Sequence, residues 1–351
     1  MKVLNIINGL GQGGVEKVLI ETIRHTHDKI DHSILIKIPD NIYEEELKNI
    51  GVDVYLAPKA KNIYKHIKFM ENFFKNNAHK FDVMHYYGGS LNYYLPIALA
   101  RYYKLPIVIH SHNSKTSKYI TSKTHKFFKA LNNSYNDTFN LACSKEAGSW
   151  MFGSNNYELL YNGIDIDKFS NVDLKNSEYM VIGHIGTFLP VKNQIYLIDL
   201  LEKLLKTSNK YRVLMVGEGP TRDKVKKYVQ EKALEDYVTF VDFQKEVQSL
   251  YGLFNIFIMP SFYEGLPLVL IEAQAVGIPI LASNNIDKDA RINDNFDFFE
   301  LEDMDECLEK IPYLLEKGCI KTELYGSPFD INVMANRIIE IYYEASEQLG
   351  D

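Results

Sequence analysis

Residues 256–282 have the sequence IFIMPSFYEGLPLVLIEAQAVGIPILA, and this stretch decides the fold. Ile256–Pro260 is a short apolar run typical of a buried strand, and Ile278–Ala282 is another. Between them, Pro267–Val276 has the composition of a helix; proline is well suited to the first helical turn, and Gly277 to the end of the helix. The stretch therefore predicts a strand, a helix and a second strand of one parallel sheet.

The same alternation continues in both directions along the 351 residues. Further strands are predicted at Val3–Ile7, Ser33–Ile38, Val52–Leu56, Asp82–Tyr86, Pro106–His110, Phe139–Cys143, Val181–Ile185, Arg212–Val216 and Val238–Val241. Further helices are predicted at Val15–His25, Ile63–Asn76, Tyr93–Tyr103, Asn193–Lys206, Thr221–Lys232 and, amphipathic and last in the chain, Asn332–Leu349. Such alternation is typical of a doubly wound α/β architecture with parallel sheets.

The alternation pauses once, which predicts two domains. Asn162 and Gly163 form a turn signal, and Asp173–Glu178 is short and polar, so a linker is expected at 165–180. A chain of this length also fits two domains of ordinary size. We expect an N-terminal domain over 1–170, a second domain over 180–325 and a C-terminal helix over 329–349.

The composition excludes several classes of protein. No apolar run approaches the roughly 18 residues that cross a bilayer, and the stretch Met1–Ile7 is too short for a secretory signal. The three cysteines, Cys143, Cys307 and Cys319, are scattered, so neither a disulfide framework nor a cysteine zinc site is expected. A cytosolic location is the default.

The net charge of −7 hides an asymmetry. Residues 1–175 carry a net charge of +5 and the remainder −12, and the window 59–129 holds 13 basic side chains against two acidic ones. A basic, aromatic surface favours an anionic partner, which could be a membrane surface, a phosphorylated lipid or a nucleic acid. The alternative is a lysine-rich face that only contacts solvent.

A glycine-rich loop, Gly9–Gly14, follows the first predicted strand and fits the pattern G-x-G-x-x-G. Glycines allow the backbone to approach a ligand, and a helix amino terminus favours an anion. A dinucleotide site would also need an acidic residue after the second strand, for which Asp40 is the candidate. The alternative is a tight turn between strand and helix.

Two carboxylates eight residues apart, Glu264 and Glu272, make the strongest candidate site. Glu264 is predicted on the loop at the carboxyl end of a strand, where ligands bind in open α/β sheets. The backbone N–H groups of Gly265–Leu268 could hold a diphosphate, and a carboxylate beside them could accept hydrogen bonds from sugar hydroxyls. Glu272 could instead be a surface residue, but its apolar neighbours predict a buried helix.

This carboxylate pair resembles the hallmark of the family-four retaining glycosyltransferases of the GT-B fold. Four further segments resemble motifs of that family in the expected order: Gly13–Lys17, Asn162–Asp165, Gly186–Asn193 and Val216–Pro220. The resemblance implies two facing Rossmann-like domains with a nucleotide sugar between them, and a C-terminal helix that crosses back to the first domain. The chain is similar to sugar transferases of capsule and exopolysaccharide synthesis.

The resemblance also implies roles for individual residues. The diphosphate of the donor would be bound by Lys192, Gly13, Gly14, Gly186, Thr187, Gly265, Leu266, Leu268 and Val269. Glu264 would bind hydroxyls of the donor sugar, Glu272 the ribose, and Phe243 with Gln244 the base. His110 or His112 would contact the sugar or the acceptor.

The catalytic set implied by the resemblance is Glu264, Lys192, His110 and His112, with no metal. Thr187 is a departure, because the family commonly has arginine at that position. Lys192 would then neutralise the departing diphosphate alone or with another cation.

The implied activity is the retaining transfer of a hexosyl group from a nucleotide sugar, such as a UDP-hexose or UDP-N-acetylhexosamine, to a glycan on a polyprenyl diphosphate. No cofactor beyond the donor substrate and no nucleic acid is expected. The basic 59–129 region would bind an anionic membrane through Lys115, Lys118, Lys123, Lys126, Lys129, Tyr119, Phe127 and Phe128. The protein would then be cytoplasmic and peripheral at the inner face of the plasma membrane.

Two alternatives remain open on the sequence. A non-catalytic subunit that binds nucleotide sugars would explain Thr187. An NAD-dependent oxidoreductase or epimerase would explain the glycine loop but neither Glu264 nor Lys192.

Overall fold

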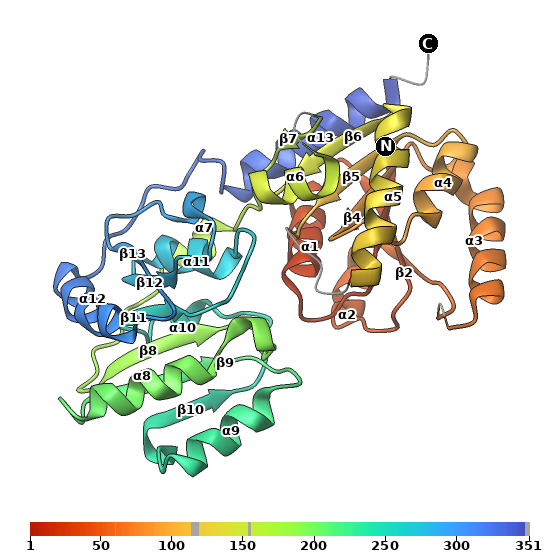
Figure 1. Cartoon of the computed structure of the whole chain (residues 1–351). Helices are drawn as coiled ribbons and strands as arrows, with labels where there is room; N and C mark the ends of the chain where they lie inside the picture. The colour runs from red at the N-terminus through yellow and green to blue at the C-terminus, as the bar shows by residue number, and fades with distance from the viewer. Residues whose placement is uncertain (60, 114–118, 154–155, 348–351) are drawn as a thin grey trace. The chain divides into compact units, whose positions relative to one another are not determined.

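The computed structural model describes residues 1–59, 61–113, 119–153 and 156–347, with side chains for all of these except 119–122. The chain forms two compact units. Unit 1 is Met1–Gly163 together with the residues from Pro328 onward, and unit 2 is Ile164–Ser327. Each unit is built on one parallel sheet covered by helices (Figure 1).

Unit 1 has a seven-stranded parallel sheet in the order β3-β2-β1-β4-β5-β6-β7. Its strands are β1 (Lys2–Ile7), β2 (Asp31–Ile36), β3 (Asp53–Leu56), β4 (Val83–Gly88), β5 (Ile107–Ser111), β6 (Thr138–Ala142) and β7 (Glu158–Leu159). Its helices are α1 (Gly14–Thr26), α2 (Glu44–Asn49), α3 (Ile63–Asn77), α4 (Leu95–Tyr102), α5 (Tyr119–Tyr135), α6 (Lys145–Phe152) and α13 (Ile331–Glu347).

Unit 2 has a six-stranded parallel sheet in the order β10-β9-β8-β11-β12-β13. Its strands are β8 (Met180–Ile185), β9 (Tyr211–Val216), β10 (Val238–Val241), β11 (Ile256–Met259), β12 (Ile280–Ser283) and β13 (Phe296–Phe299). Its helices are α7 (Ile166–Ser170), α8 (Ile195–Leu205), α9 (Arg222–Glu231), α10 (Gln248–Tyr251), α11 (Leu268–Val276) and α12 (Met304–Lys317). The predicted alternation of strand and helix is confirmed in both units.

The differences from the sequence prediction are local. β2 begins and ends two residues before the predicted span 33–38. The sequence analysis did not predict the strands β7 and β13 or the helices α2, α5, α6, α7, α10 and α12. The helix α12 carries a proline at the internal position Pro312. The last predicted residue of the C-terminal helix, Leu349, lies outside the described residues.

The helix α13 belongs to unit 1, as the resemblance implied for the C-terminal helix (Figure 1). It packs against α1, β4 and β5. Its side chains Met334, Ile338 and Tyr342 are fully buried, and the Arg337 guanidinium binds the carboxylate of Glu158 at 2.7 Å. The described residues contain no helix that is long and apolar enough to cross a membrane.

The two faces of the unit 1 sheet differ in chemistry. One face carries apolar side chains such as Leu4, Met84 and Ile107, which pack in a core with α3 and α4. The other face lies beneath α1 and α13, and several of the side chains that alternate with the apolar ones along the strands are imidazoles on this face. We call His32, His85, His110 and His112 the histidine file, and all four side chains are buried.

The histidine file is connected by ring contacts and by hydrogen bonds to the covering helices. The ring centroids of His110 and His112 lie 4.1 Å apart, and those of His85 and His110 lie 5.5 Å apart. The Nδ1 atom of His85 lies 2.7 Å from the hydroxyl of Tyr342 on α13. The Nε2 atom of His32 lies 2.8 Å from the hydroxyl of Thr26 on α1. The file therefore joins the sheet to both helices.

Burial keeps these imidazoles neutral. It lowers the pKa of His32 and of His110 to about 3, and the pKa values of His85 and His112 fall well below their usual range. The Asp31 charge partly opposes the lowering of the His32 pKa. The pKa values of the other three rings are affected by neighbouring imidazoles, the Asn162 side chain and the Leu160 backbone. A proton on His85, His110 or His112 would thus lack a compensating carboxylate among these groups.

The histidine file predicts an acid-labile fold. Below a pH of about 6.5 the unfolded chain binds protons that the folded chain does not, so stability falls as the pH falls. Each buried histidine contributes a slope of about 1.4 kcal/mol per pH unit, or about 2 kcal/mol between pH 6.5 and 5. Urea unfolding followed by circular dichroism at a series of pH values measures this slope.

The variant His110→Leu isolates one member of the file, because the His110 ring is fully buried and leucine carries no titratable group. We expect the slope between pH 5 and 6.5 to decrease by about 1.4 kcal/mol per pH unit in this variant. Equal slopes for the variant and the wild type would contradict the burial of a neutral His110.

Candidate functional site

The carboxyl ends of the unit 2 strands meet at one edge of the sheet, because all six strands are parallel. The loops that follow β8, β9, β10 and β11 therefore lie along that edge. They carry most of the residues predicted from the sequence, namely Gly186, Thr187, Lys192, Phe243, Gln244, Glu264, Gly265 and Leu266. The structure thus gathers on one edge residues that span 80 positions of the sequence.

The loop after β8 is held by backbone contacts with the loop after β9. The Phe188 N–H donates to the Glu218 carbonyl at 2.7 Å, and the Gly186 N–H donates to the Val216 carbonyl at 3.0 Å. Gly217 and Gly219 have φ values of 136° and 147°, and a Cβ on either would collide with the backbone of the first loop. Only glycine allows this approach, so the second loop fixes the shape of the first.

Lys192 and Glu264 form an ion pair at this edge, with Nζ and Oε1 2.6 Å apart. Their side chains are 17% and 16% exposed. The two loops are also joined by the Phe262 N–H, which donates to the Val191 carbonyl at 2.8 Å. The pair places a cation that can bind a phosphate next to a carboxylate that can accept hydrogen bonds from hydroxyls.

His184, which the sequence analysis did not single out, lies directly behind this loop at the end of β8. Its ring is fully buried, and burial lowers its pKa to about 4. Its Nδ1 lies 3.0 Å from the carbonyl of Ile258, which can only accept, so the Nδ1–H donates. Its Nε2 has no hydrogen-bond partner and faces the space beside Gly186 and the Lys192 side chain. A lone polar residue in an apolar strand was the signal that could have identified it.

The helix α11 confirms the expectation of a buried helix after Glu264. Pro267 is its N-cap residue, so the helix begins one residue later than predicted, and Gly277 ends it with a φ of 95°. No side chain caps its amino terminus, to which Leu268 and Val269 belong.

Glu272 is fully buried on α11, as its apolar neighbours predicted. Its carboxylate accepts a hydrogen bond of 2.8 Å from the hydroxyl of Tyr251 on α10. Burial and the Glu272 charge together raise the pKa of Tyr251 well above its usual range. The sequence analysis missed Tyr251, because no local pattern links it to a residue 21 positions away.

The glycine loop of unit 1 makes room for the chain's own carboxylates. A Cβ on Gly13 would collide with the Glu16 carboxylate, and a Cβ on Gly11 would lie 2.5 Å from the Asp40 carboxylate. Burial is the main cause that raises the pKa of Glu16, and the Asp40 charge adds to it. Gly13 is the N-cap residue of α1, and Gly14 its first residue. Glu16 therefore lies at the helix terminus where the sequence predicted a ligand anion.

His110 and His112 are members of the histidine file and are 0% and 7% exposed. The sequence analysis expected one of them to contact a ligand. Their rings contact each other and Tyr87, with centroids 5.8 Å and 5.6 Å from the tyrosine ring. Their neighbours in unit 1 are thus other buried rings.

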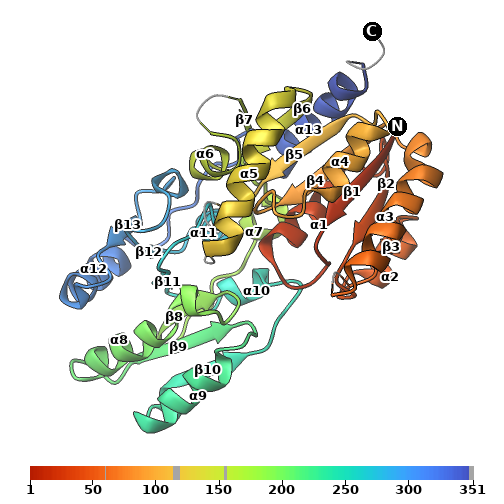
Figure 2. The same cartoon turned by 45° about the vertical axis from the view of Figure 1, so that its right-hand side comes forward.

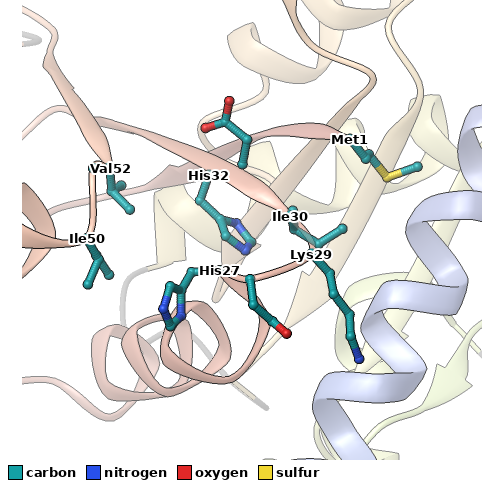
Figure 3. A pocket seen from close by; sticks show the side chains of 10 residues that line it. Met1, His27, Lys29, Ile30, His32, Ile50 and Val52 are labelled. Carbon is teal, nitrogen blue, oxygen red and sulfur yellow. The ribbon is translucent and has the colours of Figure 1, made fainter.

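A pocket lies at the opposite edge of the unit 1 sheet, where β2 begins (Figure 3). It is lined by Met1, residues 27–32 and residues 50–52, so no predicted site residue contacts it. His32, at its base, has partners for both ring nitrogens, because Nδ1 accepts from the Asn5 amide at 3.2 Å and Nε2 meets Thr26. We assign no ligand to this pocket.

Comparisons with known proteins find a family pattern in unit 2. The pattern of the family "Glycosyl transferases group 1" matches residues 165–325, which is nearly all of unit 2.

Three curated relatives are glycosyltransferases by their names. The chain is 29% identical over 308 residues to EpsF of Bacillus subtilis, covering 81% of this chain and 79% of EpsF. It is 25% identical over 358 residues to the capsular polysaccharide biosynthesis glycosyltransferase CapH of Staphylococcus aureus, covering 97% and 98%. It is 24% identical over 206 residues to an Escherichia coli galactosyltransferase that acts on GlcNAc-diphosphoundecaprenol, covering 52% and 53%.

Among solved structures, the chain is similar to Anabaena HepE in complex with UDP, with a TM-score of 0.77 and 18% identity over 98% of this chain and 100% of HepE. A likeness at this level of identity shows the fold. The parallel sheets of both units and the similar solved structures show that the chain has the GT-B fold, and residues 165–325 are similar to the group 1 glycosyltransferases.

Proposed function

We propose that this glycosyltransferase moves a hexosyl group from a UDP-sugar, with retention, to a glycan on a polyprenyl diphosphate in capsule or exopolysaccharide synthesis. The observation that carries the proposal is the contact between Lys192 and Glu264 at the carboxyl edge of the unit 2 sheet. The names of CapH, of the Escherichia coli galactosyltransferase and of the HepE complex support the pathway, the acceptor and the nucleotide, respectively.

The chief task in such a transfer is to stabilise the negative charge on the departing diphosphate. In this proposal the Lys192 ammonium exchanges the Glu264 carboxylate for the diphosphate when the donor binds. The exchange releases Glu264 to accept hydrogen bonds from the donor sugar. The acceptor hydroxyl then attacks the face that the diphosphate leaves, through an oxocarbenium-like state, and the leaving phosphate takes its proton.

The presence of threonine at position 187 bears on how much of the diphosphate charge Lys192 must stabilise. The threonine offers no cation, and its carbonyl accepts a 3.1 Å hydrogen bond from the buried amide of Gln194. Lys192 is therefore the cation that we assign to the diphosphate. A subunit that binds UDP-sugars without transferring them is the second candidate, and Thr187 favours it.

The remaining assignments are predictions of the family resemblance. They give Phe243 and Gln244 to the base, Glu272 to the ribose, and the amino terminus of α11 with Gly186 to the diphosphate. Gly13, Gly14, His110 and His112 are assigned to the substrates in the same way. In this proposal unit 2 holds the donor and unit 1 receives the acceptor, with no cofactor besides the donor and no nucleic acid. The protein would act at the cytoplasmic face of the plasma membrane.

Removing either member of the ion pair should abolish most of the activity. We expect Lys192→Ala and Glu264→Gln each to lower kcat by about 10²–10³-fold, since each removes a group that stabilises transition-state charge or holds the sugar. Release of UDP from UDP-sugars with a polyprenyl-diphosphate-linked acceptor measures this effect. Lys203→Ala is the matched control, because Lys203 forms an exposed ion pair with Asp305 in the same unit. Equal activity of Lys192→Ala and the wild type would overturn the assignment.

UDP should stabilise the folded protein, and NAD should not. A ligand at 100 times its Kd adds about 2.7 kcal/mol of stability, which raises the Tm by a few degrees. We expect the UDP shift to be smaller in Lys192→Ala. Stabilisation by NAD alone would support the oxidoreductase instead. Stabilisation by UDP without turnover of any UDP-sugar tested would support the non-catalytic subunit.

A further inference from the structure

The helix α3 carries an apolar stripe that unit 1 covers over only part of its length. Positions 63, 67, 70 and 74 lie on one stripe, because side chains three and four residues apart share a helix face. Met70 and Phe74 are 0% exposed and pack in the core of unit 1, whereas Ile63 and Ile67 are 69% and 37% exposed. Tyr64 beside them is 71% exposed. The amino-terminal half of the stripe is thus left open by its own domain.

The open half is held in a fixed position. The His66 ring is buried, with Nδ1 2.6 Å from the Pro58 carbonyl and Nε2 2.7 Å from the Tyr93 hydroxyl. The side chain of Asn62 caps the helix by accepting from the Lys65 N–H at 3.1 Å. The exposed side chains therefore stand on an anchored helix end.

Two more exposed apolar side chains lie at the same edge of the sheet. Leu56 ends β3 and Ile38 follows β2, and each is 49% exposed. The register pairs Ile36 with Leu56, so Ile38 leaves the sheet next to the end of β3. The helix α3 lies beside β3 (Figure 2), and the Tyr55 ring on β3 has its centroid 5.0 Å from that of the Phe73 ring on α3. We call Ile38, Leu56, Ile63, Tyr64 and Ile67 the α3 patch.

Along the amino-terminal half of α3 and the segment before it, the charge has one sign. Lys59, Lys61, Lys65 and Lys68 are all exposed, and the sequence contains no acidic residue from 54 to 70. Large exposed apolar side chains next to several exposed lysines match the surface of an anionic bilayer, where apolar groups enter the interface and lysines meet phosphates.

The sequence analysis expected the basic 59–129 region, which contains α3, to bind the membrane and named residues around α5 for the contact. Of those named residues, Lys123, Lys126 and Phe127 are exposed, whereas others that the structure describes face the protein. Lys129 turns inward, and its ammonium donates to the carbonyls of Ser149 and Trp150 at 2.8 and 2.9 Å. The Phe128 ring stacks on Tyr94. Lys115 and Lys118 lie outside the described residues, as does the side chain of Tyr119. Of the three predicted aromatic residues, only Phe127 is known to be exposed.

We propose that the α3 patch docks this protein on an anionic lipid bilayer, with Ile63, Tyr64 and Ile67 entering the headgroup region and the four lysines binding lipid phosphates. The inference deepens the proposed function, because it rests on an acceptor that is carried by a membrane lipid. It requires no change in the chemistry of the unit 2 edge.

The test compares two triple variants of the full chain in co-sedimentation with vesicles. The first variant is Ile63→Gln, Tyr64→Gln and Ile67→Gln, which keeps the charge and good helix formers. The matched control is Tyr102→Gln, Tyr135→Gln and Tyr343→Gln, which removes three exposed large side chains elsewhere on unit 1. The vesicles contain either phosphatidylcholine alone or phosphatidylcholine with about one-third phosphatidylglycerol.

We expect the wild type and the control to bind the anionic vesicles and the α3 variant to bind them at least about tenfold more weakly, since three apolar contacts are lost. All three proteins should bind neutral vesicles weakly. Equal binding of the α3 variant and the wild type to anionic vesicles would overturn the proposal. The proposal would also be overturned if the wild type formed a dimer that the α3 variant did not form, while both bound vesicles equally. The patch would then bind a second copy of the chain.

A second measurement separates this inference from the proposed function. With a short water-soluble acceptor analogue, the α3 variant should keep the wild-type kcat, whereas Lys192→Ala should not. Loss of turnover on the soluble analogue by a folded α3 variant would also overturn docking as the role of the patch. Activity of Lys192→Ala would count against the proposed function and leave the vesicle result to be judged separately.

Discussion

The parallel direction of every strand is the constraint on which the rest of this structure depends. In a parallel sheet each connection must return the chain to the starting edge, so the loops that follow the strands all lie at the other edge. In unit 2 this brings the Lys192 loop, the glycine pair 217 and 219, and the Glu264 loop together. The ion pair at 2.6 Å then follows from topology, since 72 residues separate its members in the sequence.

At both glycine-containing loops, a carboxylate of the chain lies beside the group that could bind an anion. At the unit 2 edge, Lys192 is neutralised by Glu264. In unit 1, the helix terminus that could attract an anion lies beside the carboxylate of Glu16. An incoming diphosphate would compete with a carboxylate of the chain at either place. Such competition lowers affinity for small anions such as free phosphate and favours ligands that also satisfy the displaced carboxylate, as a sugar hydroxyl does for Glu264.

The sequence predicted those features that depend on local pattern. Apolar runs marked the strands, Gly277 marked the end of α11, and the apolar neighbours of Glu272 marked its burial. Features that depend on distant partners could not be predicted in this way. Tyr251 meets Glu272 only because α10 and α11 pack together, and His184 is recognised as a neighbour of Lys192 only once the loop after β8 is folded.

The surface charge of unit 1 is another feature that the sequence alone predicted only in part. The positive charge of residues 59–129 was visible in the sequence, but its distribution over the helices was not. The Lys129 ammonium donates hydrogen bonds to two backbone carbonyls of the neighbouring segment, whereas the lysines at the start of α3 are exposed. Charge counting measures how many cations a segment holds, and only the fold determines which of them face a partner.

The return of α13 to unit 1 has a consequence for synthesis of the protein. Unit 2 is continuous in sequence, whereas unit 1 needs residues from both ends of the chain. During synthesis on the ribosome, unit 2 can fold before α13 has been made. The histidine-bearing face of the unit 1 sheet is then still uncovered, because Tyr342, which contacts His85, lies on α13. A nascent or truncated chain that ends before Ile331 would expose that face to solvent and to other chains. The seventeen-residue helix α13 is thus needed to cover that face of the unit 1 sheet.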